Sequence, residues 1–182
     1  MTVNVQLPTA ETTKAWGRAL AGRLQAGDLV ILVGELGAGK TTLVQGLAGA
    51  LDVAGNVASP TFIIARQHRP LGDGPWLIHA DAYRIESLDE LDALDLDASL
   101  EQAITVVEWG QGVVEDLAQD RLVVELRRPS GAESESGATV GSDVIPSLEQ
   151  LEAEPRIGLA YGVGARWEGV ALPGSPESDR DL

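Results

Sequence analysis

The sequence contains no cysteine, and this absence removes several kinds of chemistry. Disulfide bonds, thiolate catalysis and cysteine-ligated zinc are all excluded. Histidine is nearly as scarce, because His68 and His79 are the only two, so a histidine-rich metal site is excluded as well. Aromatic residues make up only 4 % of the chain. The hydrophobic content of 44 % is still sufficient for a folded core, which aliphatic residues and alanine must build.

Long hydrophobic runs and an excess of positive charge are also missing. No stretch approaches about 18 uninterrupted apolar residues, and the first five residues carry no basic group, so we expect a cytoplasmic protein without membrane contact. The chain has 13 basic and 28 acidic residues, a formal net charge of −15. Such a surface repels phosphate backbones, which argues against a protein that coats DNA or RNA and against a cationic membrane-surface helix.

Segments typical of strands and helices alternate over the first 128 residues. Strands are predicted at 3–7, 29–33, 61–66, 76–80, 104–108 and 122–127, and helices at 10–25, 40–51 and, in an acidic stretch, 86–97. Because strands that alternate with helices favour parallel pairing, we predict an α/β fold. The expected architecture is a three-layer sandwich around a mixed sheet with a parallel centre.

The composition changes after residue 128. Residues 1–128 carry 10 basic and 18 acidic groups, whereas 129–182 carry 3 and 10 in less than half that length. Small, polar and acidic residues dominate the beginning of this second part, as in solvated or disordered segments. We predict one domain over 1–128, an acidic flexible insert over 129–154 and a disordered tail over 173–182. Between insert and tail, 155–172 is expected to form a closing β-hairpin of the same domain, from strands at 156–161 and 166–172.

One motif carries the chemistry. The segment from Gly34 to Thr41 fits G-x-x-x-x-G-K-[ST] at every position, after a predicted buried strand and at the start of a predicted helix. Its glycines let backbone amides converge on a phosphate chain, and the helix adds its unpaired amides and positive dipole end. The fold is therefore predicted to be of the P-loop NTPase kind. Lys40 is expected to hold the β- and γ-phosphates, and the Thr41 hydroxyl to bind Mg²⁺. The remaining ATP-binding positions of the segment are Leu36, Gly37, Ala38, Gly39 and Thr42.

A P-loop also needs an acidic residue at the end of a neighbouring strand to hold the metal. Glu108 and Asp81 both follow apolar runs of strand character. The pattern favours Glu108 for Mg²⁺, because His79 interrupts the run before Asp81. Asp81 then orients the attacking water or lies further from the metal, and the reverse assignment stays open. Neither histidine is assigned a role.

Three weaker signals concern the nucleotide. The guanine-recognition motif N-K-x-D is absent, since neither Asn4 nor Asn56 precedes a lysine, which favours ATP over GTP. Thr61, in Ser59-Pro60-Thr61, stands where switch residues approach the γ-phosphate, although an ordinary turn fits equally well. Trp109 fits either the core or the rim of a nucleotide site.

Four blocks together resemble the TsaE family, also called YjeE, of small bacterial P-loop ATPases. The blocks are Gly34 to Thr42, Ser59-Pro60-Thr61, Asp81-Ala82-Tyr83-Arg84 and Val107-Glu108-Trp109. Their order and spacing match the family over roughly residues 3–128. Glu35 stands where the family commonly has aspartate, and the predicted insert departs from the family's compact ending.

The resemblance implies a function that the spacing alone does not give. It implies an ATP-binding and ATP-hydrolysing component of the tRNA threonylcarbamoyladenosine machinery, which supports turnover of the TsaB–TsaD transferase and meets tRNA only through that partner. It implies that Lys40 holds phosphates, that Thr41 and Glu108 bind Mg²⁺, and that Asp81 and Thr61 lie by the γ-phosphate. By the same resemblance Thr9 borders the adenine and Trp109 lies near the nucleotide. Tyr83 and Arg84 then belong to a switch or partner surface, as Ser59 does through the switch-like block.

Two other functions use the same loop. A small-molecule kinase usually carries several arginines on a lid, and between Gly55 and Glu101 the sequence offers only Arg66, Arg69 and Arg84. A nucleotide-dependent switch would bind ATP, change its affinity for a partner and hydrolyse very slowly. Phosphate release distinguishes an ATPase from the switch, and transfer to an acceptor other than water would reveal the kinase.

Overall fold

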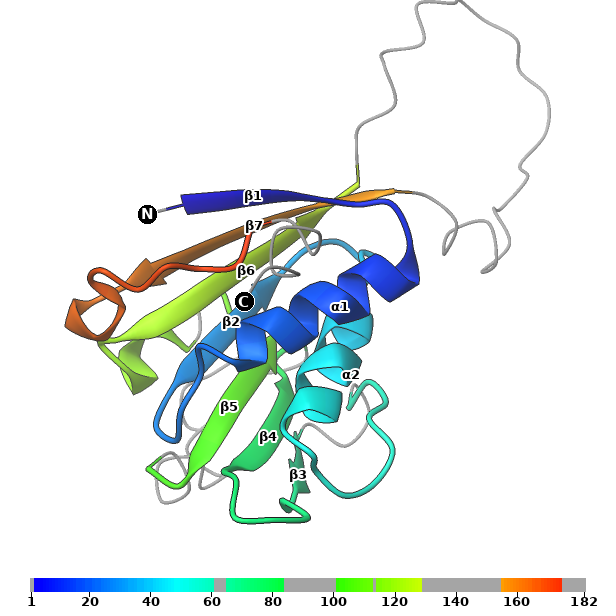
Figure 1. The fold of residues 1–182 in the computed structure, drawn as a ribbon. Helices are drawn as coiled ribbons and strands as arrows, with labels where there is room; N and C mark the ends of the chain where they lie inside the picture. Colours follow the sequence, from blue (N-terminus) through cyan, green and yellow to red (C-terminus); the bar gives the residue numbers. More distant parts are fainter. Residues whose placement is uncertain (1, 61–64, 84–100, 113, 129–154, 175–182) are drawn as a thin grey trace, which may run out of the picture.

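The computed structural model describes residues 2–60, 65–83, 101–112, 114–128 and 155–174. Within these ranges seven strands form one sheet in the order β1-β7-β6-β2-β5-β4-β3 (Figure 1). Their bounds are β1 Thr2–Leu7, β2 Leu29–Val33, β3 Ala65–His68, β4 Trp76–Asp81, β5 Ala103–Glu108, β6 Arg121–Arg127 and β7 Arg156–Val163. The helices are α1 Ala10–Ala21 and α2 Lys40–Ala50, with short 3₁₀ turns at Glu115–Leu117 and Ala165–Trp167.

The sheet is parallel at its centre and antiparallel at its edges. Strand β2 pairs in parallel with β5 and β6, and β5 pairs in parallel with β4. The pairs β3–β4, β6–β7 and β1–β7 are antiparallel. The predicted α/β class, with a mixed sheet and a parallel centre, is therefore confirmed. Parallel pairing also brings the carboxyl ends of β2, β4 and β5 to one edge of the sheet, where ligands of open α/β folds bind.

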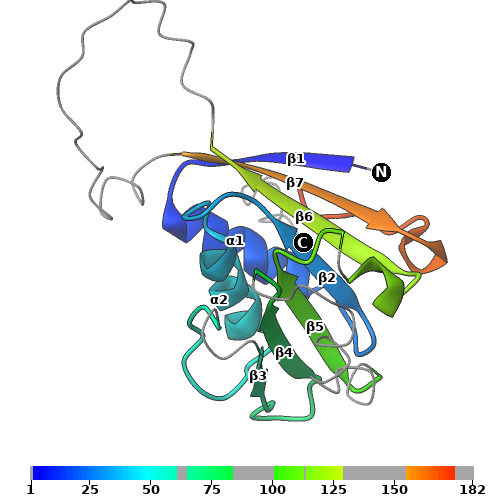
Figure 2. The same cartoon turned by 180° about the vertical axis from the view of Figure 1, so that it is seen from behind.

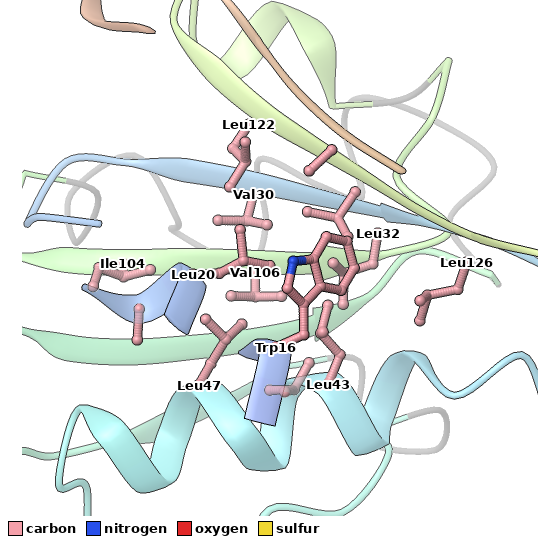
Figure 3. Close-up of a cluster of buried hydrophobic side chains, with 14 of the residues drawn as sticks. Trp16, Leu20, Val30, Leu32, Leu43, Leu47, Ile104, Val106, Leu122 and Leu126 are labelled. Carbon is pink, nitrogen blue, oxygen red and sulfur yellow. The ribbon is translucent and has the colours of Figure 1, made fainter. Parts of the chain in front are cut away.

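Both helices cover the same face of the sheet, in front of it in Figure 1 and behind it in Figure 2. Trp16 of α1 and Leu43 of α2 are fully buried against Val30, Leu32 and other apolar side chains of the central strands (Figure 3). On the opposite face a second apolar cluster includes Val114, with Leu117 packed against it. The central strands β2, β4 and β5 are thus buried on both faces, as their continuous apolar sequences require.

The two helices approach each other unusually closely. A Cβ atom at Gly46 would lie 2.1 Å from the Lys14 carbonyl oxygen, and one at Gly17 would lie 2.4 Å from the Leu43 carbonyl oxygen. Both positions therefore require glycine for steric reasons. The beginning of α1 is fixed as well, because the Thr9 side chain accepts a hydrogen bond from the Thr12 amide at 3.1 Å in a capping box. Helix α1 is in this way held beside the amino end of α2.

The structure of residues 155–174 differs from the predicted closing hairpin. Arg156–Val163 is one strand, β7, inserted between β1 and β6, so both of its edges are already paired. The predicted partner strand at 166–172 does not exist. Its first residues form the 3₁₀ turn, and Arg166 makes an ion pair with Asp28 at 3.0 Å. Trp167 and Leu172 of this segment join the apolar cluster that contains Trp16, and Trp167 packs over Gly162 of β7.

Other predicted boundaries also shift. Helix α1 ends at Ala21 rather than near Gln25, because the Asp28 carboxylate accepts the Gln25 amide at 2.8 Å and holds a turn there. The predicted tail begins too early at 173, since Pro173 is buried and its carbonyl accepts the Trp16 indole N–H at 3.1 Å. The predicted acidic helix at 86–97, the insert at 129–154, and residues 61–64 and 175–182 lie outside the described residues. In the part that is described, no helix has the length and apolar character to cross a bilayer.

Candidate functional site

The loop between β2 and α2 adopts a conformation that depends on its glycines. Gly37 and Gly39 have φ angles of 74° and 100°, in the left-handed region. A Cβ at Gly34 would lie 2.5 Å from the Leu126 carbonyl oxygen, so a side chain is excluded there too. Gly39 is the N-cap of α2 and gives it no side-chain cap. The first amides of α2 are therefore available to an anion held by this loop.

Lys40 is held inside this loop. It is 4 % exposed, and its Nζ donates to the Gly34 and Glu35 carbonyl oxygens at 2.8 and 3.0 Å. The ammonium also lies 4.0 Å from the centre of the Trp109 ring. Burial lowers the pKa of Lys40 from its ordinary value, and the nearby carboxylates of Glu108 and Asp81 oppose that shift. A bound phosphate chain would strengthen the charged form further.

The two predicted carboxylates lie opposite each other where β4 and β5 end. Asp81 pairs with Glu108 in the parallel register, and they are 4 % and 3 % exposed. Glu108 Oε1 accepts the Thr41 hydroxyl at 2.9 Å, which joins the predicted metal-binding pair directly. Asp81 Oδ1 accepts a hydrogen bond from the Tyr83 amide at 2.9 Å. This contact with the following turn fixes the orientation of the Asp81 carboxylate.

This donor set fits a magnesium ion. Hydroxyl and carboxylate oxygens are the ligands that Mg²⁺ prefers. The residues that the structure describes include no cluster of three or more Asp, Glu or His that would form a complete metal cage.

Trp109 lies beside the loop and not in the core. It is half-buried, has a positive φ of 60°, and packs its ring 5.3 Å from that of Tyr83. Tyr83 is 65 % exposed, and Leu36, at the tip of the loop, is 85 % exposed. The structure therefore places an aromatic and apolar rim around Lys40.

A cavity of about 240 Å³ opens on the other side of the loop. Its lining residues come from the beginning of α1, the loop, α2 and β7: Thr9, Ala10, Thr13, Lys14, Gly37, Gly39, Thr42, Gln45 and Arg156. Thr9, predicted beside the adenine, and Thr42, predicted beside the phosphates, thus face one cavity. Of the other predicted residues, Ser59 lies exposed in the loop after α2. Thr61 and Arg84 lie outside the described residues.

Two arginines of the site were missed by sequence reasoning. Arg128, just after β6, donates from Nη2 to the Leu36 carbonyl oxygen at 2.9 Å. Arg156, at the beginning of β7, donates from Nη2 to the Gly37 carbonyl oxygen at 3.3 Å and is 5 % exposed. No local motif marks either residue. The available signal was that both border the predicted insert, at facing ends of consecutive strands.

His79 is the third missed residue. It is fully buried in β4, and its Nε2 lies 2.9 Å from Glu108 Oε1. The signal was its position two residues before Asp81. In a strand that spacing places both side chains on the same face of the sheet.

Comparison with known proteins identifies the family to which this arrangement belongs. A family model described as "Threonylcarbamoyl adenosine biosynthesis protein TsaE" matches residues 7–135. The chain belongs to the TsaE family. The resemblance carried by the four sequence blocks is thereby confirmed, and the family is one of P-loop nucleotide-binding proteins.

Individual relatives agree with the family model. A Streptomyces coelicolor protein named tRNA threonylcarbamoyladenosine biosynthesis protein TsaE is 60 % identical over 116 residues, which is 63 % of this chain and 78 % of the relative. A Bacillus subtilis protein of the same name is 39 % identical over 150 residues, covering 81 % of this chain and 92 % of the relative. The crystal structure of B. subtilis YdiB matches with a TM-score of 0.63 and 29 % identity, over 92 % of this chain and 90 % of that one. The fold and the family are thus supported by separate comparisons.

Proposed function

We propose that this protein binds and hydrolyses ATP with Mg²⁺ within tRNA threonylcarbamoyladenosine biosynthesis, and that it supports turnover of a TsaB–TsaD threonylcarbamoyl transferase. The observation that carries the proposal is the convergence of Lys40, Thr41 and Glu108 on one glycine-dependent loop. The names of the relatives support the pathway, because they describe threonylcarbamoyladenosine biosynthesis.

The residues around the loop have different roles, which depend on their positions. The loop amides and Lys40 hold the phosphate chain, and Thr41 and Glu108 hold the magnesium ion. When bound, that ion neutralises the charge that develops on the phosphate oxygens. Asp81, buried beside Glu108, is suited to orient the attacking water. Together these roles describe hydrolysis without a covalent intermediate.

The nucleoside and the partner follow from the rest of the site. Thr9 and Thr42 line the cavity next to the loop, which we assign to the nucleoside and the first phosphate. The absence of N-K-x-D supports ATP over GTP. With a net charge of −15, the protein is suited to reach tRNA through a partner rather than directly.

The deciding experiment measures phosphate release from ATP·Mg²⁺ with and without the matching TsaB–TsaD pair. We expect the pair to stimulate release, and Lys40→Ala to abolish both release and tight ATP binding, because it removes the buried cation of the loop. Arg18→Ala, which removes an exposed cation of α1 that does not line the cavity beside the loop, is the matched control.

Three results would contradict the proposal in different ways. Unchanged ATP affinity in Lys40→Ala would refute the P-loop assignment itself. Phosphate that appears on a small acceptor instead of in solution would identify a kinase. ATP binding without release, in the presence of the pair, would identify a nucleotide-dependent switch.

A further inference from the structure

A buried histidine touches the carboxylate assigned to the metal. His79 is 0 % exposed on β4, and its Nε2 lies 2.9 Å from Glu108 Oε1 on β5. The parallel register pairs His79 with Val106 and Asp81 with Glu108. Because side chains two residues apart in a strand share a face, His79 lies on the same side of the sheet as both carboxylates. Its place is therefore fixed by two central strands.

In this contact the histidine is the hydrogen-bond donor and the carboxylate is the acceptor. An ionised carboxylate can only accept, so Nε2 carries the hydrogen and donates it to Glu108. The same Oε1 accepts the Thr41 hydroxyl at 2.9 Å. Among the described residues, the hydrogen bonds to the Glu108 side chain therefore converge on Oε1, which leaves Oε2 for a cation.

A merely structural role does not explain this histidine. Its other ring nitrogen, Nδ1, is buried and has no hydrogen-bond partner among the described residues. Leaving a buried polar atom unpaired costs free energy, which an apolar residue at this position would avoid. The contact with Glu108 is the feature that sets His79 apart from its apolar neighbours Ile78 and Ala80.

We propose that His79 is a positioning residue for the metal: it donates Nε2–H to Glu108 and fixes the carboxylate so that Oε2 faces the Mg²⁺ bound with the nucleotide. The inference rests on the proposed function, because it assigns Glu108 to the ion. Partners that orient metal ligands typically change metal affinity about 10- to 100-fold when they are removed.

The test compares two amides of different reach. His79→Gln places an amide N–H near the position of Nε2, whereas the shorter side chain of His79→Asn does not reach Glu108. The affinity for AMP-PNP is measured by calorimetry in EDTA and over a series of Mg²⁺ concentrations, with Lys40→Ala alongside. Thermal unfolding of both amide variants checks that they are folded.

We expect His79→Asn to raise the Mg²⁺ concentration needed for half-maximal strengthening of AMP-PNP binding about 10- to 100-fold. His79→Gln should stay close to the unsubstituted protein, and affinities in EDTA should agree for all three. In a Glu108→Gln background, His79→Asn should add no further change, because the two side chains act through one contact. Equal Mg²⁺ dependence in His79→Asn and the unsubstituted protein would overturn the inference. An equal rise of the required Mg²⁺ concentration in His79→Asn and His79→Gln would overturn it as well.

A second measurement needs no substitution at His79. Nitrogen NMR of the unsubstituted protein should show opposite tautomers for its two histidines. His79 should carry its hydrogen on Nε2, whereas His68 should carry it on Nδ1, which lies 3.1 Å from the Ala54 carbonyl oxygen. Finding His79 with a bare Nε2 would overturn the inference. Unchanged AMP-PNP affinity in Lys40→Ala would instead overturn the proposed function, so the two failures are distinguishable.

Discussion

The two sides of the phosphate loop are built differently. On the side of β4 and β5, buried carboxylates meet a hydroxyl and an imidazole, with Glu108 as the shared acceptor. On the side of β6 and β7, Arg128 and Arg156 donate to the carbonyl oxygens of Leu36 and Gly37. We call these the carboxylate side and the arginine side. The first offers oxygen atoms to a cation, and the second brings positive charge next to the loop.

Under the proposed function, this contrast accounts for the binding of a polyphosphate by a strongly acidic protein. A net charge of −15 says nothing about where the few basic groups lie. Lys40 and Arg156 are both almost fully buried beside the loop. Their fields act at short range in a poorly hydrated place, where charges interact more strongly than on the surface. Local placement therefore outweighs the overall charge balance.

The largest effect is expected on the carboxylate side. Glu108→Ala should reduce Mg²⁺-dependent phosphate release about 100-fold or more, because it removes the proposed ligand of the ion, while AMP-PNP binding in EDTA changes little. Asp81→Ala should also slow release but should keep the Mg²⁺ dependence of AMP-PNP binding. Calorimetry in EDTA and in Mg²⁺ separates the two effects. If Asp81→Ala alone abolishes the Mg²⁺ dependence, the roles of the two carboxylates are reversed.

The contrast between the sides also shows what the sequence could predict. The loop, β2, α2 and the pair Thr41 and Glu108 were predicted, because a contiguous motif and apolar runs determine them locally. His79 was missed because its role depends on pairing between β4 and β5, and a histidine in an apolar run carries no signal of its own. The arginine side was missed because Arg156 reaches the loop only through the insertion of β7 between β1 and β6. The predicted hairpin was wrong for the same reason, since nothing local specifies that long-range pairing.

A smaller effect is expected on the arginine side. Arg156→Gln should weaken AMP-PNP binding about tenfold, since a charge-assisted contact is worth roughly 1.5–3 kcal/mol and glutamine keeps part of the hydrogen bonding. The Mg²⁺ dependence of binding should remain, which is the opposite of the result for Glu108→Ala. Calorimetry in EDTA and in Mg²⁺ again gives both quantities.

Arg121→Gln is the matched control for that substitution. Arg121 begins β6 at the far end of the sheet and donates to the Ala118 carbonyl oxygen at 3.4 Å, away from the loop. The Arg121→Gln substitution should leave AMP-PNP binding unchanged. Loss of the Mg²⁺ dependence in Arg156→Gln would show that the two sides do not act separately.

The smallest effect is expected from shortening the connection on the arginine side. Deleting residues 130–153 should leave AMP-PNP affinity, phosphate release and thermal unfolding nearly unchanged. Arg127 pairs with Ile157 in the antiparallel register, so the five residues left between them suffice for a hairpin loop. A fall in AMP-PNP affinity like that of Arg156→Gln would show that the connection helps to place the two arginines. Loss of folding would show instead that 129–154 is part of the domain, because β7 could not then reach its place between β1 and β6 without it.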